Sequence, residues 1–140
     1  MVFLERGRMQ IRTGVDIIEV DRIKKGIEEN GDNFLNKVFT PAEIAYCNSK
    51  SIVKYEHFSG RFAVKEAIFK AVSSTLDNKY SLTWKNMEII NNEEGKPLVR
   101  FVNIEDDNLK RNLDRIKNID VSISHIKENA VGVAVAEIED

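Results

Sequence analysis

The longest helical pattern in the sequence, residues 55–75, most constrains the fold of this chain. The stretch contains no proline, and its one glycine, Gly60, lies near its start. Large apolar side chains recur in it at helical spacing, namely Phe58, Phe62, Phe69 and Val72. The chain has 140 residues, and domains most often contain about 100–150 residues. The sequence therefore predicts one domain organised around one long central helix.

Strand patterns lie on both sides of this helix in the sequence. Residues 10–18 alternate, with Ile11, Val15 and Ile17 on one face and Arg12, Gly14 and Asp16 on the other. Four more strands are expected, at residues 84–91, 97–102, 119–125 and 130–138. Shorter helices are expected at residues 21–27, 40–48 and 106–116, the second of which begins with a capping box of Thr40 and Glu43. The predicted fold class is α+β, a single domain with a mainly antiparallel sheet packed on the long central helix.

The composition argues against several classes of protein. The formal net charge is −2, whereas a general nucleic-acid-binding protein needs a dominant positive field. No apolar run reaches the roughly 20 residues of a membrane-spanning helix, so neither nucleic acid nor membrane is an expected partner. The single cysteine, Cys47, cannot form an internal disulfide, which is typical of a reducing cytoplasm. Residues 1–9 lack the apolar region of a secretory signal and are interpreted as an N-terminal extension ahead of a domain at 10–140.

The last predicted strand is apolar on both faces. Val131, Val133 and Val135 share one face, and small residues share the other, namely Ala130, Gly132, Ala134 and Ala136. A strand that is apolar on both sides is usually covered on both sides. Two interpretations are open. Either a helix covers one face and a loop the other, or the small-residue face packs against another subunit.

Glu66 and Lys70 are four residues apart, so they lie one turn from each other on the same side of the central helix. An ordinary surface ion pair would explain this spacing. Phe62 and Phe69, however, place aromatic bulk beside the pair, and charged groups near apolar groups need partners. A metal–phosphate site would supply such partners, with Glu66 binding a hard cation and Lys70 binding a phosphate oxygen.

Asp16 is the candidate for a second carboxylate. It ends a strand on the face opposite the apolar one, a position where a surface aspartate is common. Magnesium usually takes one or two carboxylates together with substrate phosphates and waters. Asp16 and Glu66 would meet that requirement if the fold brings them together.

The remaining polar candidates have weaker patterns. Lys65 points about 100° away from Glu66 on the helix and forms a positive stripe with Arg61, which is either solvated or meets an anion. His125 shares a strand face with apolar residues, so a histidine at the edge of the core is the ordinary interpretation. A Ser/His/Asp triad is weakly supported, because strand alternation points Ser124 away from His125. His57 is expected to be a surface residue.

Four segments taken together carry a more specific signal. They are residues 14–22 (GVDIIEVDR), 60–71 (GRFAVKEAIFKA), 95–97 (GKP) and 121–125 (VSISH). In this order and spacing they resemble the holo-[acyl-carrier-protein] synthase family of 4′-phosphopantetheinyl transferases. The resemblance extends from about Met9 to the C-terminus. The pair of a G-x-D strand and a K-E-A-x-x-K-A helix is specific, whereas any one segment alone is weak.

The resemblance implies the fold of these transferases and a reaction. Phosphopantetheine would pass from coenzyme A to a serine of apo-acyl carrier protein, in support of fatty acid biosynthesis. It implies Mg²⁺ held by Asp16 and Glu66 against the pyrophosphate of coenzyme A, with Lys70 on a phosphate oxygen, so these three are the expected catalytic residues. Glu66, or a water held by either carboxylate, is the preferred base. The other implied cofactor-binding residues are Lys65 and, around the nucleotide, Arg61, Pro97 and His125.

The family also implies an assembly and a docking surface. Three subunits would assemble with the active sites at their interfaces, and the doubly apolar last strand agrees with this homotrimer. A basic helix after the first strand would dock the acidic carrier, a role matched here by Arg22, Lys24 and Lys25. The chain departs from the family where it carries Glu28, Glu29 and Asp32. The sequence leaves open whether this acidic stretch changes the carrier preference, and which pathway the carrier serves.

Two alternatives to a phosphopantetheinyl transferase are weighed. A non-catalytic module could use the basic helix to dock an acidic partner, with salt-sensitive binding and no need for magnesium or coenzyme A. A different metal-dependent phosphoryl or nucleotidyl transferase could use the same two carboxylates. Neither explains why the GKP and VSISH segments accompany the helix motif.

Overall fold

The computed structural model describes residues 9–140. The expected N-terminal extension lies outside the described residues except for Met9, which begins the first strand. The elements, with η denoting 3-10 helices, are β1 (Met9–Glu19), α1 (Val20–Asn30), α2 (Asp32–Val38), α3 (Pro41–Asn48), η2 (Ser51–Val53), α4 (Lys54–Val72), η3 (Ser73–Thr75), η4 (Lys79–Ser81), η5 (Trp84–Asn86), β2 (Met87–Asn91), β3 (Pro97–Phe101), α5 (Asp107–Asp114), β4 (Ile116–His125) and β5 (Asn129–Glu139). Within residues 9–140, none of the helices combines the length and the apolar character needed to cross a membrane.

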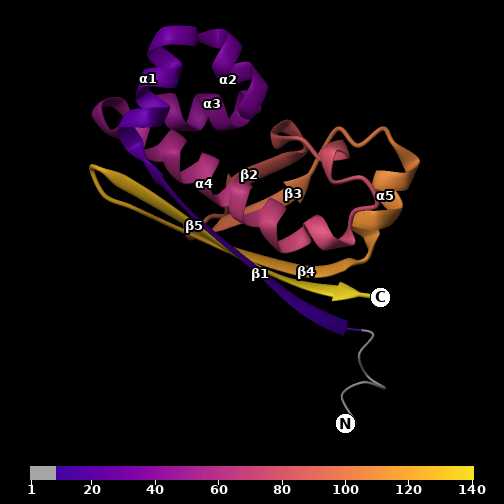
Figure 1. Ribbon diagram of the computed structural model, residues 1–140. Coiled ribbons are helices and arrows are strands. Elements are labelled where there is room, and N and C mark those ends of the chain that lie inside the picture. Colours follow the sequence, from indigo (N-terminus) through magenta and orange to yellow (C-terminus); the bar gives the residue numbers. More distant parts are fainter. Residues whose placement is uncertain (1–8) are drawn as a thin grey trace.

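Helix α4 is the centre of the molecule. It lies across one face of a three-stranded antiparallel sheet with the order β1-β5-β4, while β2 and β3 form a separate antiparallel hairpin. Figure 1 shows α4 between this sheet and the hairpin, with α1, α2 and α3 gathered at one end. The α+β class, the antiparallel sheet and the long central helix are thus confirmed.

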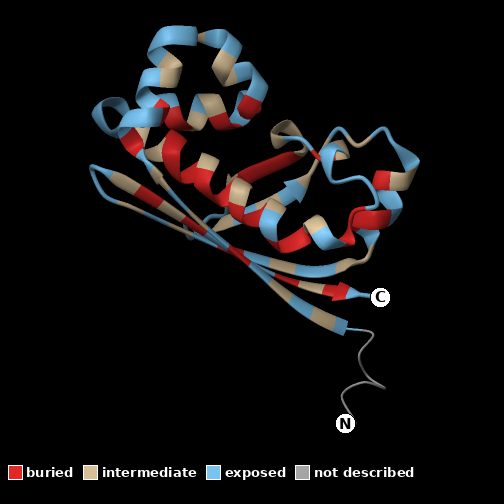
Figure 2. Ribbon diagram, viewed as in Figure 1, coloured by how far each residue is buried: buried red, intermediate tan, exposed pale blue. Residues whose placement is uncertain are grey.

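Two glycines let α4 rest directly on the sheet. A Cβ atom at Gly14 in β1 would lie 1.9 Å from the carbonyl oxygen of Ala67, and one at Gly132 in β5 would lie 2.4 Å from the Cα of Val64. Neither position has room for a side chain. Figure 2 shows the buried residues that result, along α4 and in the middle strand β5. The small residues of β5 therefore face the helix, as the first of the two interpretations predicts for one face, and the alternative in which this face packs against another subunit is wrong. The loop that the first interpretation places on the other face is not found within residues 9–140, where Val133 and Val135 are exposed.

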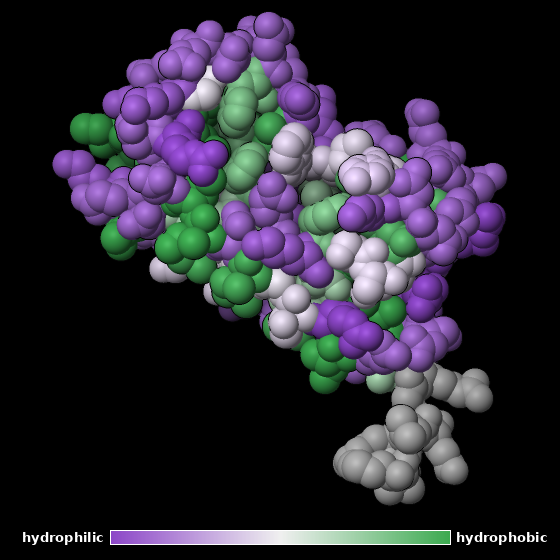
Figure 3. Space-filling model, viewed as in Figure 1, coloured by the Kyte–Doolittle hydropathy of each residue, from purple (hydrophilic) through white to green (hydrophobic). Residues whose placement is uncertain are grey.

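The opposite face of the sheet is apolar and open. Ile11, Val15 and Ile17 of β1 are 58–68% exposed, and Val133 and Val135 of β5 are also exposed. Hydrophobic side chains recur in the space-filling view along the edge where β1 runs (Figure 3). An apolar sheet face of this kind, which nothing in residues 9–140 covers, is a feature of interaction surfaces.

Local signals set some of the element boundaries, among them the N-termini of α3 and α5. The capping box of α3 is present, because the Glu43 backbone N–H donates to Thr40 Oγ1 at 3.4 Å and the Thr40 N–H donates to Glu43 Oε1 at 2.8 Å. The strand expected at 84–91 is shorter than predicted. Its first three residues form η5, and β2 begins at Met87.

Candidate functional site

The inner face of β1 carries Asp16 to the side of α4. Asp16 lies two residues after Gly14 and therefore shares the face that contacts the helix. The ammonium of Lys70 lies 3.2 Å from Asp16 Oδ1 and donates to the carbonyl oxygen of Val15 at 3.0 Å. The ordinary helix pair expected between Glu66 and Lys70 is not among the ion pairs of residues 9–140, because Lys70 reaches across to the strand instead.

Glu66 completes this group. Burial raises the pKa of its carboxyl, the negative charge of Asp16 raises it further, and Lys70 opposes the shift. Asp16 and Glu66 thus lie near enough to repel each other, with one ammonium beside them. The group, two carboxylates and one lysine, has an excess negative charge that a cation would offset.

A hard divalent cation fits this set of donors. No cluster of three or more His, Cys, Asp or Glu side chains suited to a metal ion occurs in residues 9–140. An ion bound by Asp16 and Glu66 would need its other ligands from a substrate or from water. Magnesium is commonly bound in this way, by one or two carboxylates with substrate phosphates and waters.

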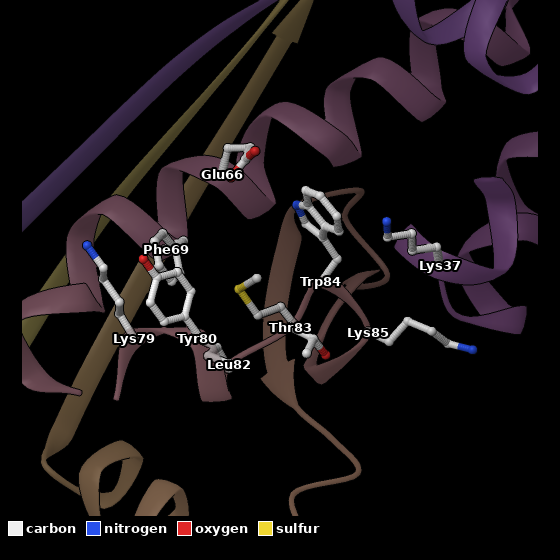
Figure 4. Close-up of a pocket in the computed structure, with 10 residues that line it drawn as sticks. Lys37, Glu66, Phe69, Lys79, Tyr80, Leu82, Thr83, Trp84 and Lys85 are labelled. Carbon is white, nitrogen blue, oxygen red and sulfur yellow. The ribbon is translucent and has the colours of Figure 1, made fainter. Parts of the chain in front are cut away.

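A cavity of about 510 Å³ opens beside Glu66. In Figure 4, Glu66 projects from α4 above the cavity, with Phe69 and Tyr80 on one side and Trp84 and Lys37 on the other. Its remaining lining comes from Lys79, Leu82, Thr83, Lys85 and Met87. This volume is in the range of small-molecule sites, which combine apolar walls with a few polar groups. Sequence reasoning missed this cavity, because much of its wall comes from residues 79–85, where the helices η4 and η5 are too short for a periodic pattern.

A second, smaller cavity of about 200 Å³ lies on another side of α4. The guanidinium of Arg61 lies 4.1 Å from the ring centroid of Tyr46 and donates to the side chain of Asn91. Arg61 is buried, yet its Nε has no hydrogen-bond partner within the described residues. The lining residues are Tyr46, His57, Arg61, Asn91, Gly95, Pro97, Ile123 and His125. The structure therefore brings together Arg61, Pro97 and His125, the three residues expected around the nucleotide.

Histidines form one wall of this smaller cavity. His125 Nδ1 lies 3.0 Å from Glu56 Oε1, and its ring packs edge-on against His57 at a centroid distance of 4.8 Å. Burial lowers the pKa of His57, and the neighbouring His125 lowers it further. His57 was expected on the surface, so its place in the lining is a correction. Its position one turn before Arg61 was the signal available in the sequence.

Lys65 occupies a different place from the one expected. Both Lys65 and Arg61 are buried, so the solvated stripe is excluded. The Lys65 ammonium is enclosed by protein acceptors and lines neither cavity. A contact with a cofactor does not fit this arrangement.

The basic residues of α1 are exposed, as a docking surface requires. Arg22, Lys24 and Lys25 lie on the solvent side of the helix. Lys25 is paired with Asp21 at 3.0 Å, and the Lys24 ammonium lies 5.7 Å from the ring centroid of Tyr55. The acidic stretch of Glu28, Glu29 and Asp32 is exposed as well.

Comparison with known proteins places the chain in a family. The family model described as 4′-phosphopantetheinyl transferase superfamily matches residues 12–135. The chain is 40% identical to the holo-[acyl-carrier-protein] synthase of Ruminiclostridium cellulolyticum over 134 residues, 94% of this chain and 96% of that protein. It is 43% identical to the synthase of Thermodesulfovibrio yellowstonii over 122 residues, 87% of this chain and 94% of that protein.

Solved structures agree with this assignment. A holo-(acyl-carrier-protein) synthase from Bacillus anthracis in complex with CoA (3′,5′-ADP) superposes with a TM-score of 0.72 at 30% identity, covering 94% of this chain and 99% of that one. The Helicobacter pylori synthase in complex with coenzyme A gives a TM-score of 0.73 at 27% identity, covering 89% and 98%. The chain belongs to the 4′-phosphopantetheinyl transferase superfamily.

Proposed function

We propose that this chain transfers the 4′-phosphopantetheine group from coenzyme A to a serine of apo-acyl carrier protein, giving the holo-carrier and 3′,5′-ADP. The observation that carries the proposal is the convergence of Asp16, Glu66 and Lys70 beside a cavity, in a member of this superfamily. The relatives named above are holo-acyl-carrier-protein synthases, and two of the solved ones hold coenzyme A or its nucleotide. A cytoplasmic location and a role in fatty acid biosynthesis belong to the same proposal. The free, buried thiol of Cys47 suits a reducing compartment.

The site residues divide the reaction between them. Asp16 and Glu66 are the carboxylates that would hold Mg²⁺, which when bound offsets the charge of the pyrophosphate. The ammonium of Lys70 faces Asp16 and is partly exposed, so it can donate to a phosphate oxygen. There it stabilises the charge that develops on the leaving group.

The transfer forms one phosphorus–oxygen bond, breaks another and releases one proton. The bond from the serine oxygen to the β-phosphorus of coenzyme A forms, and the bond from that phosphorus to the oxygen of 3′,5′-ADP breaks. The serine proton passes to Glu66 or to a water held by Asp16 or Glu66. In the metal-free protein burial and Asp16 raise the pKa of Glu66, and the charge of Mg²⁺ bound to its carboxylate would oppose that shift.

Incubation with coenzyme A, Mg²⁺ and an apo-carrier, followed by intact mass spectrometry, tests the function directly. The carrier is expected to gain the mass of one phosphopantetheine. No gain, while a known transferase modifies the same carrier in parallel, would exclude the proposal. Salt-sensitive binding without transfer would favour the docking-module alternative, and a substrate screen would reveal another phosphoryl or nucleotidyl transferase.

The two halves of the site lie on different sides of α4, and this supports an interfacial site. Arg61 and Glu66 are five positions apart, so their side chains point about 140° apart around the helix axis. The two cavities share no lining residue. A coenzyme A molecule whose pyrophosphate lies at Glu66 of one subunit would then place its nucleotide in the smaller cavity, beside Arg61, of a second subunit. The open apolar face of β1 and β5 gives such copies a surface on which to pack, which supports the homotrimer.

A charge placed on this apolar face is expected to separate the subunits. Replacing Ile17, which is 65% exposed, by lysine would bury an unpaired ammonium, at a cost of about 3 kcal/mol or more. Association should weaken by at least about a hundredfold, and transfer should fall with it. Size-exclusion chromatography with light scattering measures the change. Ile52→Lys, at an exposed apolar position in η2, is the control. An active wild-type monomer would contradict the assembly.

The raised pKa of Glu66 predicts a pH dependence of metal binding. A protonated carboxyl does not ligate Mg²⁺, and burial together with Asp16 makes Glu66 take up its proton above the ordinary pKa of 4.5. Mg²⁺ affinity, measured by calorimetry, should therefore decline while the pH is still above that value. In the Glu66→Gln variant this pH dependence should be lost. An unchanged affinity down to the ordinary glutamate pKa would contradict the placement of Glu66 at the ion.

A further inference from the structure

Lys65, the first lysine of the helix motif, uses all of its hydrogen-bonding capacity within the protein. Its side chain has no exposed surface. The ammonium nitrogen lies 2.6 Å from Glu43 Oε1, 2.7 Å from the carbonyl oxygen of Val38 and 3.0 Å from that of Trp84. A lysine ammonium has three protons, and each has one acceptor here. None is left for a phosphate.

These acceptors belong to three different segments. Val38 ends α2, Glu43 lies in the first turn of α3, and Trp84 begins η5. Glu43 is itself buried, and its second oxygen, Oε2, accepts the backbone N–H of Ile89 in β2 at 2.8 Å. One ammonium on α4 therefore connects the central helix to α2, α3 and η5, and through Glu43 to β2.

The segments held by Lys65 carry one part of the wall of the large cavity. Trp84 lines it directly, and Lys37, next to Val38, also lines it. Glu66, the carboxylate at the cavity, follows Lys65 in the chain. The ammonium thus joins the backbone that carries Glu66 to the backbone of Trp84 and Val38. Figure 4 shows Glu66 on α4, with Trp84 and Lys37 together on one side of the cavity.

We propose that Lys65 is a positioning residue, which fixes the wall formed by Trp84 and Lys37 at a set distance from Glu66. Stability alone is a poor explanation for a fully buried ion pair, because replacing such a pair by apolar residues is often neutral or stabilising. A geometric role explains why the lysine connects three segments at the cavity. The effect on catalysis rests on the proposed transferase function, whereas the effect on Trp84 does not.

The test uses the full chain and the double variant Lys65→Met/Glu43→Gln, which removes both charges of the pair together. Trp84 is the only tryptophan in the sequence, so its fluorescence reports on the wall. With the fold retained by circular dichroism, quenching of Trp84 by acrylamide should increase. kcat should fall by roughly tenfold to a hundredfold, because small misplacements are costly. The KM for coenzyme A should change little, because Lys70 and Arg61, which are proposed to contact coenzyme A, are unchanged in this variant.

Three outcomes would overturn the proposal. Wild-type quenching in a folded double variant would show that Lys65 does not hold the wall. A raised KM with unchanged quenching would make Lys65 a cofactor ligand after all. Unchanged kcat and KM despite increased quenching would leave it a structural residue only.

Two further variants keep the test decisive. If the double variant does not fold, Glu43→Gln alone keeps the size of the side chain but removes its charge and turns one of its two accepting oxygens into a donor. It should shift quenching and kcat in the same directions. Lys54→Met, at the start of the same helix, is the matched control and should shift neither. If no transfer activity is found at all, the quenching result still decides the structural part of the proposal.

Discussion

Replacement of Glu66 by alanine is expected to abolish phosphopantetheine transfer while leaving the fold intact. Within residues 9–140, no hydrogen bond or ion pair joins Glu66 to another side chain, so its loss removes no structural contact of that kind. Loss of one electrostatic contribution in an active site commonly lowers kcat by about a hundredfold to a thousandfold. The proposed function gives Glu66 two roles, metal ligand and candidate base, so the loss should be at the upper end of that range. The carrier mass assay, with circular dichroism of the same sample, measures both effects.

The stability of this variant gives an independent check. A carboxyl whose pKa is raised in the folded state favours its protonated form there, so above that pKa it lowers the stability of the fold. Glu66→Ala should therefore unfold at the same or a slightly higher temperature than the wild type at neutral pH without metal. Added Mg²⁺ should stabilise the wild type and not the variant.

A matched control and a contradicting result complete this test. Glu105→Ala removes an exposed glutamate far along the chain from the site and should change neither rate nor stability. Substantial transfer by folded Glu66→Ala would reduce Glu66 to an ordinary surface residue, and it would shift the candidate metal site to Asp16 alone.

The elements whose signals are local were predictable from the sequence. α4 follows from a proline-free apolar periodicity, and α3 from the capping box at Thr40. The sequence alone could not show whether Asp16 lies near Glu66 and Lys70 of α4, because this proximity depends on the fold. Its physical basis, the close approach at Gly14, is a contact between segments more than fifty residues apart, which no local pattern contains.

Other parts of the site depend on which face of a strand or helix is buried, and residue periodicity alone does not decide this. The period of a strand defines two faces but not which one is buried. In β1 the face with Gly14 and Asp16 contacts the helix, and the apolar face with Val15 remains open. Lys65 shows the same limit on a helix, because a lysine beside Glu66 is ordinarily exposed. It is buried here only because α2, α3 and η5 supply acceptors.

The substitution Gly14→Ala is expected to cause the largest loss of stability. A Cβ atom there would lie 1.9 Å from the carbonyl oxygen of Ala67 and 3.0 Å from the backbone nitrogen of Ala71. Backbone atoms cannot rotate away, so β1 and α4 must separate. Overpacking typically costs about 1–3 kcal/mol, and a clash with backbone should reach about 3 kcal/mol. Urea unfolding monitored by circular dichroism measures this cost.

The same substitution should also impair the candidate metal site, because Asp16 lies close to Gly14 in β1. Asp16 lies two residues from Gly14 on the same face, and it pairs with Gly132, the other glycine that contacts α4. Moving β1 outward moves Asp16 away from Glu66 and Lys70. Mg²⁺ affinity should therefore fall in the folded fraction as well.

Gly26→Ala is the control for Gly14→Ala. Its Cβ would meet only the flexible ring of Phe34, at 3.2 Å, and alanine is a better helix former than glycine. This variant should keep wild-type stability or exceed it. Wild-type stability and metal affinity in Gly14→Ala would show that strand and helix can separate without consequence. The close approach of Asp16 to the helix would then not explain the glycine of the G-x-D pattern.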